Sequence, residues 1–366
     1  MLTVTRPIAP SFERLSALLR QMLQEQRYTN GGPLVSLLEL KLRELCGAQQ
    51  LVLVANGTLA IELALKGLGI AGRVITTPFT FCGGAHAVSW VGATPVYVDV
   101  DPETLTIDPV AIEAAIEPGA EAILGVHVYG QPCRVAAIDA IARRHGLAVV
   151  YDGAHAFGGH CGGAPIGGFG DATTYSFHAT KLFHTGEGGA IETRDPALAE
   201  RLRRLRNFGI ASEDVVTEAG INAKMSELAA ATGLAVLDRL AEEIAARAAL
   251  RRFYLDRLSN LPGIAPFIGS DETARLLYFI LRVSNEGEPG RRDRLHARLK
   301  GEGILARRYF YPLASELALG ADRAAAETPN AFAASREVLA LPFHGGVTPA
   351  DAERVAGVVR RFAERA

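Results

Sequence analysis

The most reactive group that this sequence offers is the amine of Lys181, in the segment that runs from Ser176 to Lys181. The segment ends a predicted strand and leads into a glycine-rich stretch at residues 185–189. Partial burial in such a loop lowers the pKa of a lysine, so the neutral amine can attack a carbonyl and form a Schiff base. A lysine considered alone is more simply a solvated loop residue. The chemistry of Lys181 therefore depends on its companions.

Asp152 and His155 form an Asp-x-x-His pair directly after the apolar run 147–151. A carboxylate at the end of a strand can hold a protonated ring nitrogen or a metal, and an imidazole beside it can donate to a ring oxygen. Each residue also has a plain structural explanation, because Asp152 could cap a turn and His155 could pack as a neutral core residue.

Gly57 and Thr58 follow the predicted strand 51–54 and precede a predicted helix at 59–68, for which Thr58 is the expected N-cap. Free amides at the start of a helix, together with the helix dipole, attract a phosphate-type anion. The same residues could form only a capped turn. Neither GxGxxG nor GxxxxGK[ST] occurs, which argues against a dinucleotide or Walker-type site.

Phe81 and Asn222 lie in two further segments of interest. Phe81 follows the predicted strand 73–77 and could stack on a flat ring or join the core. Asn222 lies in the turn 220–227, where it or Ser226 could merely cap a helix. Both residues become informative only in combination with Lys181 and Asp152.

Short apolar runs that alternate with helical stretches must position these residues. Their βαβ order predicts an α/β protein whose large domain has a mainly parallel, seven-stranded sheet flanked by helices. Ligands of such sheets bind beyond the carboxyl ends of the strands, where Lys181, Asp152 and Gly57 fall. The predicted strands are 51–54, 73–77, 95–98, 122–128, 147–151, 173–177 and 189–193.

The pattern changes after residue 225. Residues 225–258 almost lack Gly and Pro and carry apolar residues at helical spacing, which predicts one long helix. A strand at 276–283, a helix at 291–300, a second strand at 307–311 and two closing helices then predict a small α+β domain. We expect a large domain over 1–240, with 1–25 as an N-terminal segment, and a small C-terminal domain over 241–366.

Composition and charge exclude several classes of protein. The 366 residues are 49% hydrophobic and 21% charged, which is typical of folded domains. A net charge of -2 without blocks of like charge argues against a nucleic-acid or membrane partner. The four cysteines form no CxxC pair, and His155, His160 and Cys161 match no zinc spacing, so no metal site is predicted. The N-terminus has no apolar segment, and we expect a cytoplasmic protein.

Taken in chain order, a phosphate-type turn, an aromatic residue, Asp-x-x-His and Ser-x-x-x-x-Lys are the parts of a pyridoxal phosphate site on the type I aminotransferase fold. The chain resembles the DegT/DnrJ/EryC1/StrS family of pyridoxal phosphate-dependent sugar aminotransferases. The likeness runs nearly end to end and includes TNGGP (29–33), PVYVDVDP (95–102), HVYGQP (127–132), GINAKMSE (220–227) and RYFYP (308–312).

The resemblance implies a role for each candidate residue. Lys181 would form the Schiff base with pyridoxal 5'-phosphate and shuttle the proton, Asp152 would pair with the ring nitrogen, and His155 would neighbour the ring hydroxyl. The other cofactor contacts would be Phe81 on the ring face, Gly57, Thr58 and Ser176 on the phosphate and, across a homodimer with shared active sites, Asn222.

The resemblance also implies a reaction. An amino group from glutamate or glutamine would pass to a keto group of a nucleotide-linked 6-deoxyhexose, with the 4-amine of a dTDP sugar favoured. The alternatives are a 3-keto sugar aminotransferase, a dehydratase of the same fold and a non-catalytic cofactor-binding regulator. A histidine replaces the lysine in the dehydratases, so Lys181 speaks against that alternative. The expected nucleotide-sugar contacts are His184, Arg308, Tyr309 and Tyr311, although Arg308 could be a surface ion pair and one of the tyrosines could belong to the core.

Overall fold

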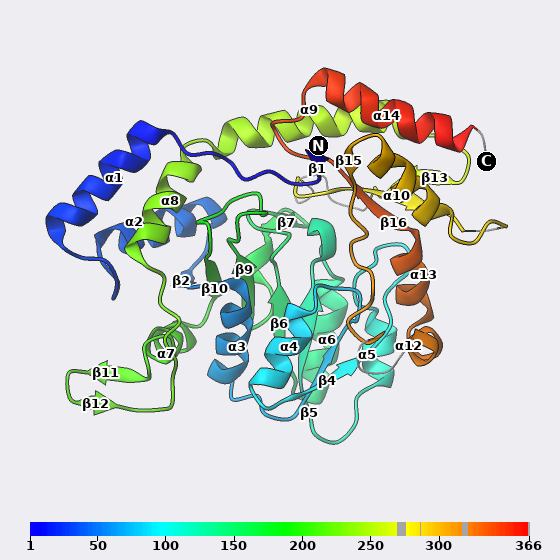
Figure 1. The fold of residues 1–366 in the computed structure, drawn as a ribbon. Coiled ribbons are helices and arrows are strands. Elements are labelled where there is room, and N and C mark those ends of the chain that lie inside the picture. The colour runs from blue at the N-terminus through cyan, green and yellow to red at the C-terminus, as the bar shows by residue number, and fades with distance from the viewer. Residues whose placement is uncertain (269–275, 286, 317–320, 365–366) are drawn as a thin grey trace.

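The computed structural model describes residues 1–268, 276–285, 287–316 and 321–364. A seven-stranded sheet forms its centre (Figure 1). All strands run parallel except β10, which is antiparallel to both of its neighbours, so the predicted fold class is confirmed. In spatial order the strands are β2 (Gln50–Val54), β10 (Gly189–Thr193), β9 (Ala172–Ser176), β6 (Ala148–Asp152), β5 (Ala120–Val126), β3 (Arg73–Thr76) and β4 (Thr94–Tyr97).

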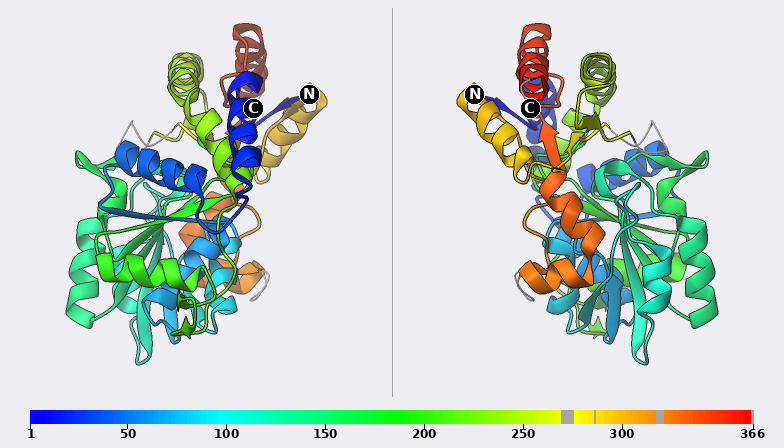
Figure 2. Two further views of the ribbon diagram at one scale, coloured as in Figure 1. Left: turned by 90° about the vertical axis from the view of Figure 1, so that its left-hand side faces the viewer. Right: turned by 90° about the vertical axis from the view of Figure 1, so that its right-hand side faces the viewer.

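Successive side chains of each strand point to opposite faces of the sheet, and each face is covered by a layer of helices. Figure 2 shows these helices on either side of the sheet. In β2, Val52 and Val54 join one core cluster and Leu51 and Leu53 join another. The first face is covered by α3 (Gly57–Gly67), α4 (Gly83–Trp90) and α7 (Pro196–Leu205). The second face is covered by α1 (Phe12–Glu25), α2 (Pro33–Cys46), α8 (Glu227–Leu237), α5 (Pro109–Ala114) and α6 (Val135–His145).

A smaller antiparallel sheet lies over the carboxyl edge of the large one (Figure 1). One of its faces shares a core with α9 (Leu240–Leu258), α10 (Arg291–Gly301) and α14 (Pro349–Ala363). Its other face, which includes Ile280 and Ala340, packs against Phe79 and Tyr129 from loops of the large sheet. The smaller sheet is formed by β13 (Ile264–Pro266), β14 (Phe279–Val283) and β16 (Val338–Leu341), and it is flanked by α12 (Ala321–Glu327) and α13 (Pro329–Glu337).

Short elements complete the described chain. The smaller sheet and the helices packed on it are called the C-terminal unit below. The strand β1 (Leu2–Thr3) pairs in parallel with β15 (Ile304–Leu305), so the first residues of the chain reach this unit. Two hairpins are formed by β7 (His160–Cys161) with β8 (Ala164–Pro165), and by β11 (Ile210–Ser212) with β12 (Val215–Val216). Single turns of 3-10 helix lie at η1 (Val128–Gly130) and η2 (Ile166–Gly168). The described residues include no helix that is long and apolar enough to cross a membrane.

Three expectations about secondary structure were wrong. The predicted helix 225–258 is two helices, because the chain bends at Asp238, whose carboxylate pairs with Arg14 of α1. The predicted strand at 307–311 is irregular beyond a single bridge between Arg307 and Ala340. The chain closes with α12, α13, the strand β16 and α14 rather than with two helices. The division into domains at residue 240 stays a prediction.

Candidate active site

A cavity of about 760 Å³ opens at the carboxyl edge of the large sheet. Its walls come from the ends of β6 and β9, the start of α3, the turn after β3 and two segments of the C-terminal unit. The structure brings most of the predicted site residues to this cavity: Gly57, Thr58, Phe81, Asp152, His155, Ser176, Lys181 and Tyr309.

Lys181 lies in a tight loop that follows β9. The loop is closed by backbone hydrogen bonds from Lys181 to His178 (2.9 Å) and from Thr185 to Phe177 (3.0 Å). Burial disfavours the ammonium and lowers the pKa of Lys181 to about 8, although the nearby carboxylate of Asp152 opposes this shift. A pKa of about 8 leaves roughly a tenth of the amine neutral at pH 7, and the neutral form is the nucleophile.

Asp152 is the last residue of β6, and its side chain is half-buried in the cavity. The amide of Ala154 donates to its Oδ1 at 2.9 Å, which fixes the carboxyl group. Burial raises the pKa of Asp152, while the Ala154 amide and the charge of Lys181 lower it. A carboxylate partly withdrawn from water in this way is stabilised by a cationic partner in the cavity.

His155 is buried, and its hydrogen bonding determines its tautomer. The amide of Tyr129 donates to Nδ1 at 3.2 Å, so Nδ1 is an acceptor and the proton of the neutral ring sits on Nε2. Burial and the charge of Lys181 hold the pKa of His155 well below its usual range. His155 is therefore a neutral donor that lines the cavity.

The start of α3 forms an anion cradle. Asn56 is the N-cap, because its Oδ1 accepts from the amide of Leu59 at 2.9 Å, and the expectation that Thr58 would be the cap was wrong. The first amides of α3, at Gly57 and Thr58, stay free of intrahelical partners. Gly57 lies so close to Ser176 that an added Cβ would stand 2.7 Å from the Ser176 Cβ. Glycine at position 57 therefore allows the N-terminus of α3 to approach Ser176, so that the first amides of the helix and the Ser176 hydroxyl line the same part of the cavity.

Aromatic residues bound the cavity on two sides. Phe81 stands on the large-domain side and is 64% exposed in this single chain. Tyr278, Tyr309 and Phe310 approach from the C-terminal unit. Sequence reasoning missed Tyr278 and Phe310. The RYFYP motif could have indicated Phe310, but its interpretation as an alternating strand directed attention to Tyr309 and Tyr311.

The residues around the cavity fit the polar groups of pyridoxal 5'-phosphate. The cradle at Gly57, Thr58 and Ser176 suits the phosphate, Asp152 suits the ring nitrogen and the Nε2 proton of His155 suits the ring oxygen. Lys181 provides the amine that such an aldehyde requires.

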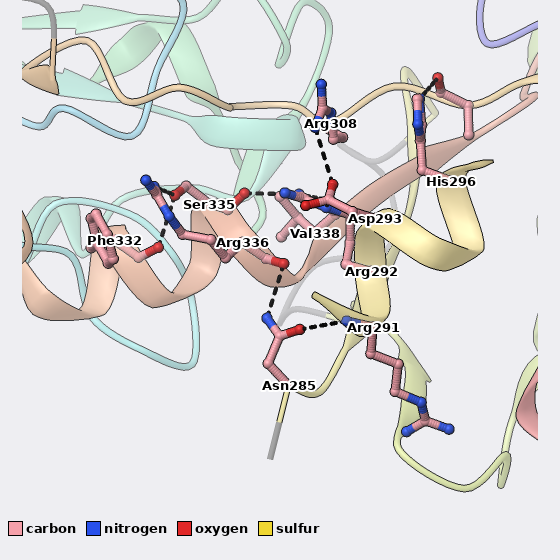
Figure 3. Close-up of polar contacts among 11 residues, drawn as sticks. Asn285, Arg291, Arg292, Asp293, His296, Arg308, Phe332, Ser335, Arg336 and Val338 are labelled. Atoms are coloured by element: carbon pink, nitrogen blue, oxygen red, sulfur yellow. Dashed lines mark hydrogen bonds and ion pairs between the residues drawn. The ribbon is translucent and has the colours of Figure 1, made fainter. Parts of the chain in front are cut away.

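His184, Arg308 and Tyr311 do not reach the cavity lining. His184 is buried against the N-terminal segment, with its Nε2 3.0 Å from the carbonyl of Ile8. Arg308 pairs with Asp293 at 3.1 Å (Figure 3) and stacks over Tyr311. The ion pair engages Nη1 of Arg308, so a diphosphate at this side chain would share it with Asp293.

Asn222 also lies away from the cavity of its own chain. It is exposed, and its Oδ1 accepts a hydrogen bond from Lys224 at 2.7 Å. A role for Asn222 at a cofactor would therefore require a second subunit.

Comparison with known proteins assigns the family. The model of the DegT/DnrJ/EryC1/StrS aminotransferase family matches residues 12–360. The chain belongs to this family. It is 39% identical over 364 residues to the dTDP-4-amino-4,6-dideoxy-D-glucose transaminase of Shigella dysenteriae, with 98% of each chain covered. It is 37% identical to the GDP-perosamine synthase of Caulobacter vibrioides, with 85% of each covered.

A solved structure of DesI in the presence of its TDP-sugar product superposes with a TM-score of 0.93 at 36% identity. The match covers 100% of this chain and 93% of that one. The predicted family and type I aminotransferase fold are therefore confirmed. The family consists of pyridoxal phosphate-dependent aminotransferases, and a solved Bacillus subtilis relative at 28% identity holds the cofactor PMP.

Proposed function

We propose that the protein is a pyridoxal phosphate-dependent aminotransferase that moves an amino group from glutamate or glutamine to the 4-keto group of a dTDP-linked 6-deoxyhexose. The observation that carries the proposal is the convergence of Lys181, Asp152, His155 and the α3 cradle on one cavity. Transaminases of dTDP-4-amino-4,6-dideoxy-D-glucose match the chain over nearly its full length, which supports the 4-amine.

Each residue has a distinct task in this proposal. The cofactor, when bound, supplies an electron-withdrawing ring that acidifies the carbon bearing the amino group. Lys181 Nζ would take the proton from that carbon and deliver it to C4′ of the cofactor. A pKa of about 8 is well matched to such a proton transfer in neutral solution. Asp152 keeps the ring nitrogen protonated, and His155 Nε2 donates to the ring oxygen.

A homodimer with shared active sites belongs to the proposal. Lys181 is the one Lys or Arg in the described cavity lining. Because a diphosphate and a dicarboxylate donor are both anionic, we expect a second subunit to supply further positive charge. The hairpin β11 to β12 projects from the large domain (Figure 1) and exposes Ile210, Val215 and Val216. A two-stranded hairpin is marginally stable by itself, so a second copy of the chain is its natural partner.

A single-turnover assay tests the reaction. The holoenzyme mixed with glutamate should release 2-oxoglutarate and then convert dTDP-4-keto-6-deoxyglucose to its amine, as detected by mass spectrometry. Lys181→Ala should abolish both steps. A regulator would release no 2-oxoglutarate, and a dehydratase would yield a product that has lost water.

A 3-keto sugar is the second candidate acceptor, because a dTDP-3-amino-3,4,6-trideoxy-alpha-D-glucose transaminase of Streptomyces venezuelae is 36% identical to the chain. Both keto sugars should be offered in the same assay. Preference for the 3-keto isomer would overturn the assignment of the carbon but not that of the reaction.

A further inference from the structure

Tyr129, in the HVYGQP segment, has an unusual backbone. It is buried, with 1% of its surface exposed, and its φ of 55° lies in the left-handed region that non-glycine residues rarely adopt. Gly130 follows with a φ of 84°. This reversal directs the Tyr129 amide toward Nδ1 of His155, at 3.2 Å.

The side chain of Tyr129 extends the other way, to the C-terminal unit. Its hydroxyl donates to the carbonyl oxygen of Tyr309. Its ring lies nearly parallel to that of Phe310, with centroids 6.2 Å apart and an interplanar angle of 3°. Tyr309 and Phe310 are the residues that this unit's irregular segment contributes to the cavity wall.

The wall segment, residues 308–311, has few other hydrogen-bonded anchors, although Phe310 also packs on Phe79 and His155, with ring centroids 6.1 and 5.7 Å apart. Arg307 is bridged to Ala340 before it, and the amide of Ala314 donates to Pro78 after it at 3.1 Å. Between these points, within the described residues, the bond from the Tyr129 hydroxyl to the main-chain carbonyl of Tyr309 is the hydrogen bond that ties the segment to the loops of the large sheet. Tyr129 therefore contacts both walls of the cavity: its amide donates to His155, and its hydroxyl donates to the carbonyl of Tyr309.

We propose that Tyr129 is a positioning residue whose hydroxyl holds the Tyr309 and Phe310 wall in place for the sugar nucleotide. The inference rests on the proposed function, because it assigns this wall to the sugar-nucleotide half of the reaction. The hydrogen bond to His155 is independent of the hydroxyl, because the main chain makes it. The ring of Phe310 also lies parallel to that of His155, with centroids 5.7 Å apart, and this contact needs no hydroxyl either. Loss of the hydroxyl should therefore weaken sugar-nucleotide binding and leave the donor half-reaction intact.

The test compares Tyr129→Phe with Tyr254→Phe. Tyr254 is a matched control, because its buried hydroxyl also donates to a backbone carbonyl, that of Pro342 at 3.0 Å, but lies away from the cavity. Tyr129→Phe should raise the KM for the dTDP-4-keto sugar about five- to tenfold, because the carbonyl of Tyr309 loses its partner. The rate of 2-oxoglutarate release and its pH profile should not change. Tyr254→Phe should alter neither half-reaction.

Amide hydrogen exchange gives a readout that needs no turnover. In the holoenzyme, residues 308–311 should exchange faster in Tyr129→Phe than in wild type, while in Tyr254→Phe they should match wild type. An unchanged KM and unchanged exchange would overturn the inference, as would an equal loss in both half-reactions. If the wild-type enzyme aminates neither keto sugar, the proposed function fails, and the exchange comparison still decides whether the hydroxyl holds the wall.

Discussion

At the scale of single residues, the site depends on the coupling between Lys181 and Asp152. Burial pushes both groups toward their neutral forms, and each charge opposes the shift of the other. A pKa of about 8 leaves roughly a tenth of Lys181 as free amine at pH 7, whereas an unperturbed lysine would leave well under a thousandth.

Replacement of Asp152 by Asn tests this coupling. Removal of the carboxylate takes away the interaction that favours the ammonium, so the pKa of Lys181 should fall below about 8. Capture of added pyridoxal phosphate by the cofactor-free protein, followed by absorbance against pH, should show a midpoint that moves to lower pH. Turnover should fall by about 10²-fold or more, because the ring nitrogen loses its partner. Asp139→Asn, which removes a carboxylate paired with Arg143 on α6 away from the cavity, is the control, and an unmoved midpoint in Asp152→Asn would contradict the coupling.

The residues that sequence alone could place near the site share one property. Asp152 ends β6, and Gly57 and Lys181 lie shortly after β2 and β9, so the direction of the strands brings all three to one edge of the sheet. Tyr129 and Phe310 could not be assigned in this way. Their positions depend on a left-handed turn and on an irregular segment about 180 residues apart in the chain, and neither follows from local periodicity.

At the scale of elements, Glu227 explains why two of the sequence motifs occur together. Its carboxylate accepts from the amides of Leu34 and Val35, at 2.8 and 3.0 Å, and so caps α2 although it belongs to α8. Gly32 leaves room for this contact, because an added Cβ would stand 2.6 Å from the Glu227 carboxyl carbon. TNGGP and GINAKMSE are thus two halves of one structural contact. Neither motif identifies the other, because they lie almost 200 residues apart.

Removal of this cap should destabilise the large domain. Glu227→Ala leaves two buried helix-terminal amides without an acceptor, and we expect a loss of about 2–4 kcal/mol in the free energy of unfolding. Glu227→Gln keeps the shape without the charge and should cost about half as much. Thermal or urea unfolding measures both variants. Glu44→Gln, an exposed change on α2 itself, is the control, and equal stability of all three variants would show that the cap is dispensable.

The elements that sequence reasoning misplaced are those defined by distant partners. The strands of the large sheet could be predicted because each is a short apolar run between turn residues. The break between α8 and α9 has no Gly or Pro to mark it in the sequence, and Asp238 at the break pairs with the distant Arg14 of α1. In the same way, Asp99 of PVYVDVDP accepts from the amides of Asn330 and Ala331 and so caps α13. A local sequence pattern cannot predict this contact, because its partners are far apart in the chain.

At the scale of the whole molecule, the described lining of the active-site cavity contains Lys181 and no other Lys or Arg. Arg203, Arg206 and Lys224 line a separate small cavity on the face that carries Asn222. Phe208 and Ile221 add exposed apolar surface there. A homodimer that brings this face against the cavity of a second copy would supply both an apolar contact and the missing cations.

Complementation between two inactive variants tests whether the sites are shared. Lys181→Ala and Asn222→Ala chains, mixed after mild dissociation, should regain about a quarter of wild-type activity, because random pairing makes about half of the dimers mixed and each mixed dimer has one intact site of two. Lys181→Ala mixed with Asp152→Asn is the matched control. Both of these changes lie in the cavity of one chain, so this pair should regain nothing. If native mass spectrometry shows mixed Lys181→Ala and Asn222→Ala dimers that hold cofactor but do not turn over, Asn222 acts within its own chain or not at all.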